Sequence, residues 1–186
     1  FMGYDYSSGA GICVPAGYAS RHLVAQFNLT SIPVGSTINS SVLHLTFKPN
    51  STGCGEFNNA ISMRAKQIND VWTVNNIKYR EIRAGLTSAS NPINVGPGGS
   101  CDSVNQRDCA WNITTNIIQN WVNTPANNFG LLVEPNENWT AGNAPPASWS
   151  NQQRLFIFYS SRQSAPNQTG PYLQVEFTAP FVDDVY

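Results

Sequence analysis

The sequence predicts an all-β domain, a two-sheet sandwich with one short helix covering one end. Short runs of alternating or β-rich residues recur along the chain, as expected of strands. Turn-forming residues separate these runs, and one segment alone has helical spacing. The clearest strands are expected at 21–28, 41–47, 60–68, 129–134, 154–160 and 172–177.

The first two strands are expected on either side of a turn. Leu23, Ala25 and Phe27 fall on one face of the first strand, because side chains alternate between faces along an extended chain. Pro33 and Gly35 then break the pattern. The next strand has an apolar face made of Leu43, Leu45 and Phe47.

The segment 113–122 is predicted to be the helix. Its apolar residues recur at i, i+4, i+5, i+8 and i+9, which places them on one helical face. Asn112 or Thr114 is expected to cap its start, and Pro125 follows its end. The apolar face consists of Ile113, Ile117, Ile118, Trp121 and Val122.

Composition indicates one secreted domain of 186 residues. Charged residues make up 11% and the net charge is -1, so we expect neither nucleic acid nor a membrane surface as partner. No apolar stretch approaches the roughly 20 residues that span a bilayer. The 22 Asn and 30 Ser or Thr replace Lys and Glu as solubilising residues. No signal peptide is visible, and the start at Phe1 suggests a processed N-terminus.

Four cysteines favour two disulfides in an oxidising compartment, so the predicted location is extracellular, secreted or at the cell surface. No C-x-x-C occurs and neither His lies near a Cys, which argues against a zinc site. Three pairings are possible. We expect Cys101–Cys109 as a local bridge and Cys13–Cys54 as a long one, with four buried thiols as the alternative.

Six Asn-x-Ser/Thr sequons, none with a central Pro, predict covalent N-linked glycans. Beside cysteines that imply an oxidising compartment, they indicate a glycoprotein. The sequence places Asn112 at the predicted start of the helix, where a capping role would compete with glycosylation. The candidate sites are Asn28, Asn39, Asn50, Asn112, Asn138 and Asn167.

Four stretches in order resemble the DNRLRE family of extracellular jelly-roll modules, relatives of which include carbohydrate-binding modules. The most specific is 21–45, in which F-N-L-T-S-I-P-V-G-S-T-I stands between two strands, like the family's "FDLS-IP-G-T-I" signature. The resemblance covers about 160 residues and implies a jelly-roll β-sandwich. The weaker stretches are 70–79, 111–122 with 128–133, and 158–161 with 171–175.

The chain departs from the family pattern at both ends. Where the family has an opening strand, only the Gly- and Ser-rich residues 1–11 stand here. Where the family ends, after a strand matching 172–178, this chain adds 179–186. We interpret 1–11 as an extension, 12–178 as the jelly-roll domain and 179–186 as a displaced donor strand.

A spare strand on one molecule and an open groove on the next would make a fibre. We therefore predict a structural protomer that polymerises with copies of itself, with Phe181, Val182, Val185 and Tyr186 inserting into the neighbour. An alternative donor is the N-terminus, through Phe1, Tyr4 and Tyr6.

The rival function is a non-catalytic carbohydrate-binding module that binds a polysaccharide. Trp139 and Trp149 lie in a loop rich in Asn, Gly and Pro, and aromatic rings in such places can stack on sugars. Covering the core or meeting a neighbouring subunit is the alternative role for both rings. Trp72 and Trp121 are expected in the core, and Trp111 fits either place.

No enzyme, cofactor or metal is predicted. His22 and His44 alternate within strands, and no Ser, Asp or Cys arrangement points to either. No pair of acidic residues stands out as the facing carboxylates of a glycosidase. Asp102 and Asp108 are candidate calcium ligands, but they lack a D-x-D-x-D spacing.

Overall fold

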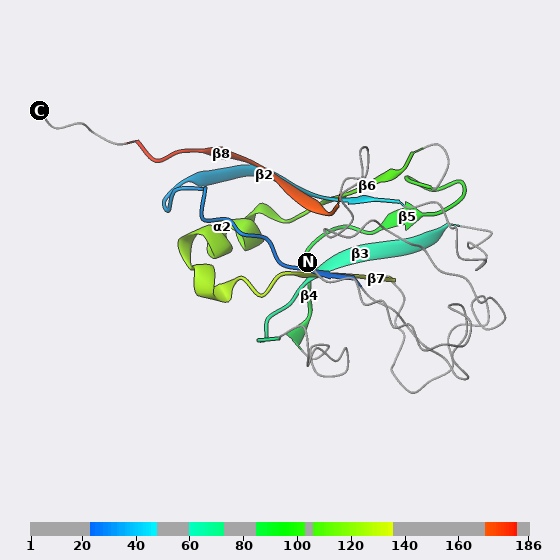
Figure 1. Ribbon diagram of the computed structural model, residues 1–186, viewed down its shortest axis with the longest axis horizontal. Coiled ribbons are helices and arrows are strands. Elements are labelled where there is room, and N and C mark those ends of the chain that lie inside the picture. The colour runs from blue at the N-terminus through cyan, green and yellow to red at the C-terminus, as the bar shows by residue number, and fades with distance from the viewer. Residues whose placement is uncertain (1–22, 48–59, 73–84, 103–105, 136–169, 182–186) are drawn as a thin grey trace, which may run out of the picture.

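The computed structural model describes residues 23–47, 60–72, 85–102, 106–135 and 170–181. These residues form two antiparallel sheets and one short α-helix (Figure 1). The predicted all-β sandwich is therefore confirmed, whereas the jelly-roll connectivity and the domain boundaries stay predictions. No helix in the described ranges is long and apolar enough to cross a membrane.

The larger sheet has five strands among the described residues, and four of them follow the order β1–β7–β3–β4. The fifth, β5, pairs with the first half of β3, whereas β4 pairs with the end of β3. The strands predicted at 60–68 and 129–134 are β3 and β7. The strands are β1 (Leu23–Ala25), β3 (Ile61–Gln67), β4 (Thr87–Ser88), β5 (Ile93–Val95) and β7 (Leu131–Pro135).

Within the described ranges, the smaller sheet has three strands in the order β6–β2–β8. They are β2 (Thr37–Thr46), β6 (Asp108–Asn112) and β8 (Tyr172–Thr178). The central strand β2 pairs with β6 on one side and β8 on the other. The strands predicted at 41–47 and 172–177 are thus confirmed, and the one at 154–160 lies outside the described residues.

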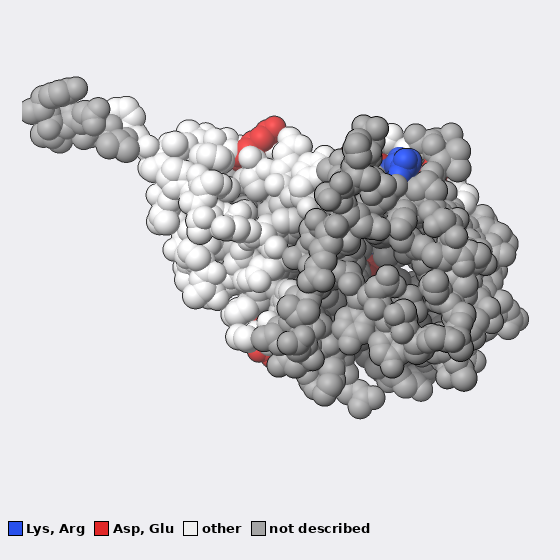
Figure 2. Space-filling view, in the orientation of Figure 1, with Lys and Arg blue, Asp and Glu red and all other residues white. Residues whose placement is uncertain are grey.

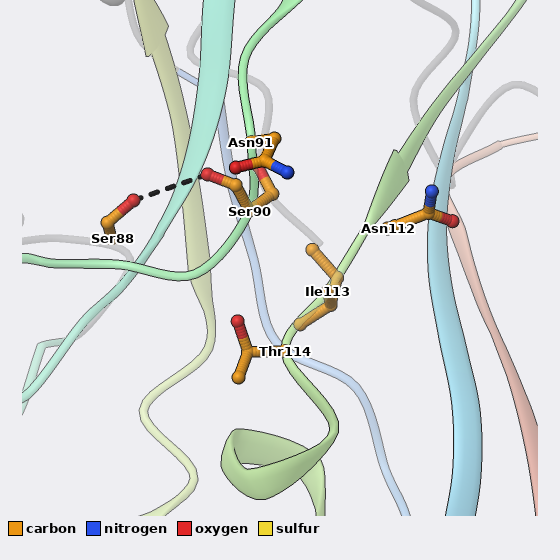
Figure 3. Close-up of a pocket in the computed structure, with 6 residues that line it drawn as sticks. All are labelled: Ser88, Ser90, Asn91, Asn112, Ile113 and Thr114. Carbon is orange, nitrogen blue, oxygen red and sulfur yellow. Dashed lines mark hydrogen bonds between the residues drawn. The ribbon is translucent and has the colours of Figure 1, made fainter.

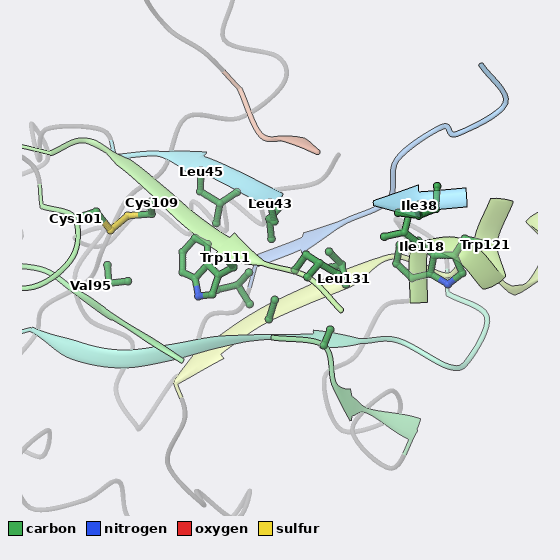
Figure 4. Packing of buried hydrophobic residues seen from close by; sticks show 14 of the residues in the cluster. Ile38, Leu43, Leu45, Val95, Cys101, Cys109, Trp111, Ile118, Trp121 and Leu131 are labelled. Carbon is green, nitrogen blue, oxygen red and sulfur yellow. A yellow bond between two sulfur atoms is a disulfide. The ribbon is translucent and has the colours of Figure 1, made fainter. Parts of the chain in front are cut away.

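The main core lies between the two sheets (Figure 4). The predicted apolar face of Leu43, Leu45 and Phe47 is fully buried there, with at most 1% of each residue exposed. Trp111 of β6 is also fully buried, and its Nε1–H donates to the Met63 carbonyl of β3 at 3.1 Å. This hydrogen bond crosses from one sheet to the other.

A second, smaller cluster covers the other face of β1 and β7. It consists of Val24, Ile68 and Leu132 with partly buried residues packed against them. Leu23 and Phe27 pack against the main core, as the alternation predicted, but Val24 on the opposite face is buried as well. Strand β1 is therefore apolar on both faces, whereas alternation identified only the face with Leu23, Ala25 and Phe27.

The predicted helix is α2 (Thr115–Asn123), and Pro125 begins a short 3-10 turn after it. Ile118, Trp121 and Val122 are buried against the main core, as their spacing predicted. Thr114 occupies the N-cap position but makes no side-chain cap; its hydroxyl donates to Ala89 O at 3.1 Å. Capping by Asn112 was wrong, because Asn112 is the last residue of β6.

One disulfide joins Cys101 to Cys109 at the start of β6, with the two Cα atoms 5.2 Å apart. This confirms the predicted local bridge. Both cysteines are buried in the main core. Cys13 and Cys54 lie outside the described residues.

Candidate functional site

Strand β8 pairs with β2 alone among the described strands, so it forms an edge of the described part of its sheet. Leu173, Val175 and Phe177 share one face of β8 by alternation and are here called the edge row; Leu173 and Val175 pack against the main core. Their partners on β2 are Leu43, Ser41 and Ile38. Those partners are buried, whereas all three residues of the edge row are partly exposed and Phe177 is 39% exposed. The edge row is therefore covered from one side only.

The outer face of β8 is polar and is held to β2 by side chains. Ser40 Oγ donates to Glu176 Oε2 at 2.8 Å, and Asn39 Nδ2 donates to Thr178 Oγ1 at 3.0 Å. Asn39 occupies a bulge, the point where the β2–β8 register shifts. These contacts hold β8 in register without covering its inner face.

At the start of β8, Tyr172 stacks on His44, with ring centroids 4.4 Å apart and planes 3° from parallel. His44 Nδ1 lies 2.8 Å from Asp108 Oδ2 on β6, so the cluster spans all three strands. Burial, and secondly the Asp108 carboxylate, raise the pKa of the Tyr172 phenol above its ordinary value. The sequence did not reveal this cluster, because only strand register brings its members together.

The chain beyond β8 passes the turn that precedes β2. A Cβ atom at Gly35, which has a φ of 86°, would lie 3.7 Å from Pro180 Cβ. The next residue, Phe181, is 90% exposed. The other predicted donor residues (Val182, Val185 and Tyr186, and the alternative donors Phe1, Tyr4 and Tyr6) lie outside the described residues. The C-terminal end of β8 lies at one end of the long axis (Figure 1).

Three candidate glycosylation sites are described, and all three are exposed. Asn28 lies in the loop after β1, where its Oδ1 accepts the Thr30 N–H at 3.0 Å. Asn39 lies in the bulge of β2, and Asn112 ends β6 without capping the helix. Asn50, Asn138 and Asn167 lie outside the described residues.

A small hollow of about 310 Å³ opens where β6 meets α2 (Figure 3). Its lining is almost entirely hydroxyl and amide side chains. Ser88 Oγ donates to Ser90 O at 3.2 Å across one wall. The polar hollow is lined by Ser88, Ser90, Asn91, Asn112, Ile113 and Thr114.

The described tryptophans face inward and do not supply a platform for sugar. Trp111 and Trp121 are both buried. Trp111, which the sequence left open, therefore belongs to the core, and the prediction of a core position for Trp121 is confirmed. Trp72 is half-buried against the smaller cluster, and its Nε1–H donates to Phe129 O at 2.5 Å. Trp139 and Trp149 lie outside the described residues.

The candidate catalytic and metal-binding residues do not converge. Asp108 contacts His44, whereas Asp102 Oδ1 accepts the Gln106 N–H at 3.4 Å. Among the residues that the structure describes, no group of three or more His, Cys, Asp or Glu is placed to hold a metal ion. His22 lies outside those ranges.

In comparisons with protein-family models, curated proteins and solved structures, no match was found for this chain. The resemblance to DNRLRE modules therefore stays a prediction from the sequence. What the chain does has to be argued from its own residues.

Proposed function

We propose that the protein is a structural protomer of a secreted, glycosylated extracellular fibre, assembled head to tail by strand donation. One observation carries the proposal. The described part of the three-stranded sheet ends in an edge strand with a partly exposed apolar row, and the same strand leads directly into Phe181, which is 90% exposed. In this proposal the chain has no catalytic role.

Burial of the tail's apolar side chains can stabilise a joint between two copies. Burying a Val, Leu, Ile, Phe or Met side chain contributes roughly 1.5–3 kcal/mol, before the cost of ordering the tail. Main-chain hydrogen bonds to the edge strand add register and further affinity. Because donor and acceptor are different surfaces, the contact is heterologous, and repetition without closure produces a filament.

The surface and the disulfide fit an extracellular fibre. The Cys101–Cys109 bridge suits an oxidising compartment. The three described sequon asparagines are all exposed, as glycosylation requires. A coat of glycans would keep a weakly charged surface soluble and resistant to proteases.

Deletion of 179–186 tests the assembly. The truncated chain is expected to fold but to remain monomeric or to aggregate without order, because its edge row lacks a donor. A synthetic peptide of residues 179–186 is expected to raise its melting temperature. Electron microscopy and thermal unfolding would measure both effects.

A point variant in the tail and a matched control elsewhere on the surface refine that deletion. Phe181→Ser removes an apolar residue that is 90% exposed, and Val71→Ser removes one that is 73% exposed after β3. Only Phe181→Ser is expected to weaken filaments. Normal fibres from the truncated chain would show that the C-terminal segment is not the donor.

Mass spectrometry of peptides from native material tests the glycan part. We expect added mass on several sequon asparagines, including Asn112, which the helix does not use as a cap. The matched control is Asn128, whose side chain donates to Phe27 O at 2.8 Å and which is not in a sequon. Unmodified Asn at all six sequons would remove the glycoprotein part of the proposal.

The polar hollow favours a second candidate, a carbohydrate-binding module. Its hydroxyl and amide groups have the chemistry that sugar hydroxyls pair with. This function predicts that a monomer lacking 179–186 binds a polysaccharide and that Asn91→Ala weakens binding. Titration calorimetry with soluble polysaccharides would measure this, and the fibre proposal predicts no loss of assembly in Asn91→Ala.

A further inference from the structure

The hydrogen bonds of β2 show which way the backbone of β8 faces. The Ile113 N–H donates to Ser41 O at 2.8 Å, and the Phe47 N–H donates to Arg107 O at 2.6 Å. Odd-numbered residues of β2 from Ser41 onward therefore direct their backbone groups to β6. Because these groups alternate sides along an antiparallel strand, even-numbered residues such as Val42 direct theirs to β8.

The register carries this alternation onto β8. Val42 is opposite Gln174, so the N–H and C=O of Gln174 pair with β2. The extra residue at the bulge belongs to β2, so alternation along β8 is unbroken. Consequently the edge row, Leu173, Val175 and Phe177, directs its backbone groups to the open edge.

The edge row therefore lacks contacts of two kinds. Its side chains are partly exposed, and its backbone groups have no partner strand among the described residues. A strand added beside β8 would pair with the backbone groups and cover the side chains together. A sugar or a small ligand in contact with the side chains alone would leave the backbone unpaired.

The molecule's own tail leaves β8 on the wrong side to supply that strand. Pro180 lies against Gly35, in the turn that leads into β2, so the chain passes β2 rather than turning back along the open edge. Phe181 then stands in solvent instead of covering Phe177. A second copy can present the same segment to the open edge without this constraint.

We infer that the open edge of β8 is the acceptor and that segment 181–186 of a second copy occupies it. This inference rests on the proposed function and specifies its joint. Extended, the segment places Phe181, Asp183 and Val185 on one face and Val182, Asp184 and Tyr186 on the other. Either face therefore brings two apolar side chains, with one carboxylate between them, to the edge row. Each copy then carries the acceptor, β8, and the donor, 181–186, in consecutive parts of its chain.

Amide hydrogen exchange of the full chain, diluted until it is monomeric and followed by NMR, tests the acceptor. The probe is a synthetic peptide of residues 179–186, with a scrambled peptide as control. At a concentration tenfold above its Kd, it should slow exchange at Leu173, Val175 and Phe177 by roughly tenfold. Gln174 and Glu176 should be slow with or without it, because β2 already pairs with them.

Each other outcome would overturn the inference. Slow exchange of the edge row in the monomeric full chain without the peptide would mean that the edge is already paired within one copy. Peptide binding and normal filaments without slowing at the edge row would place the acceptor elsewhere and leave the proposed function standing. If the peptide does not bind and the full chain forms no filaments, the proposed function fails as well.

A substitution at Val175 gives an independent test. Val175→Pro removes an N–H that faces the open edge, a position where edge strands tolerate proline. We expect it to fold but to lose filaments, whereas Val175→Thr, which keeps the N–H, should assemble. Normal filaments from folded Val175→Pro would overturn the inference, and if that variant does not fold, the exchange experiment on the unmodified chain decides.

Discussion

Tyr172 and His44 show how one pair of side chains fastens the edge strand. Their stacked rings join β8 to β2, and Asp108 extends the contact to β6. The His44 Nε2 atom is buried without a hydrogen-bond partner in the described part of the chain. A partly buried imidazole covered by a tyrosine ring and held by a carboxylate fits the structural role expected for a strand histidine.

Tyr172 should make the stability of the fold depend on alkaline pH. Burial and Asp108 raise its pKa in the folded state above the ordinary value of 10.0. The neutral phenol is therefore favoured by folding, and its contribution is present below pH 10 and lost as the pH rises through the folded pKa. Tyr172→Phe keeps the stacked ring and removes the ionisable group.

The free energy of unfolding of Tyr172→Phe should therefore fall less than that of the unmodified chain between about pH 8 and pH 11. Urea denaturation at several pH values would measure both curves. The remaining tyrosines are common to both proteins and cancel in the difference. Parallel curves would show that Tyr172 does not contribute to the alkaline loss.

At the scale of the element, helix α2 is tied to the three-stranded sheet by one glutamine. The Ile38 N–H donates to Gln119 Oε1 at 3.0 Å, and Gln119 Nε2 donates to Ser36 O at 2.8 Å. These bonds satisfy backbone groups at the start of β2, next to the bulge. The helix thus completes the end of the sheet from which the tail leaves.

The Cys101–Cys109 bridge should stabilise the segment between β5 and β6. The cysteines are eight residues apart, and closing so short a loop contributes roughly 2–3 kcal/mol in the chain-entropy model. The double variant Cys101→Ala/Cys109→Ala should therefore lose about that much stability in chemical denaturation.

A single variant provides the control for the disulfide. Cys101→Ala already removes the bridge, so its loss should be close to that of the double variant rather than half of it. A double variant as stable as the unmodified protein would show that the bridge does not contribute to stability.

At the scale of the whole molecule, the described surface is weakly charged. Charged residues make up 11% of the chain, and few of them stand out on the described part of the face in Figure 2. The proposed joint is made by apolar side chains and main-chain hydrogen bonds, and the edge row offers no Lys or Arg to pair with Asp183 and Asp184 of the donor segment. Assembly should therefore depend little on electrostatic attraction between copies.

Filaments should accordingly persist as salt is raised. Increasing NaCl from about 0.01 M to 1 M shortens the Debye length from about 30 Å to about 3 Å, which removes most attraction between exposed charges. Sedimentation of the assembled fraction would measure the effect. Dissolution in high salt would point to a joint held by ion pairs instead.

Local patterns in the sequence determined the fold class, the helix and the local disulfide. Alternation identified Leu43, Leu45 and Phe47 as a core face, and helical spacing identified Ile118 and Trp121. Both inferences succeed because a residue's face depends on neighbours within a few positions. The sequence also identified Phe181 as a candidate donor residue, because it follows the last predicted strand of the domain.

Tertiary structure alone decided which strands are neighbours, and with that the candidate site. The burial of Val24 on the second face of β1 and the meeting of His44, Tyr172 and Asp108 depend on residues far apart in the chain. The lack of a second partner for β8 among the described strands has the same origin. A strand's own pattern shows which side chains point inward, but only the arrangement of the other strands determines whether its backbone has a partner on both sides.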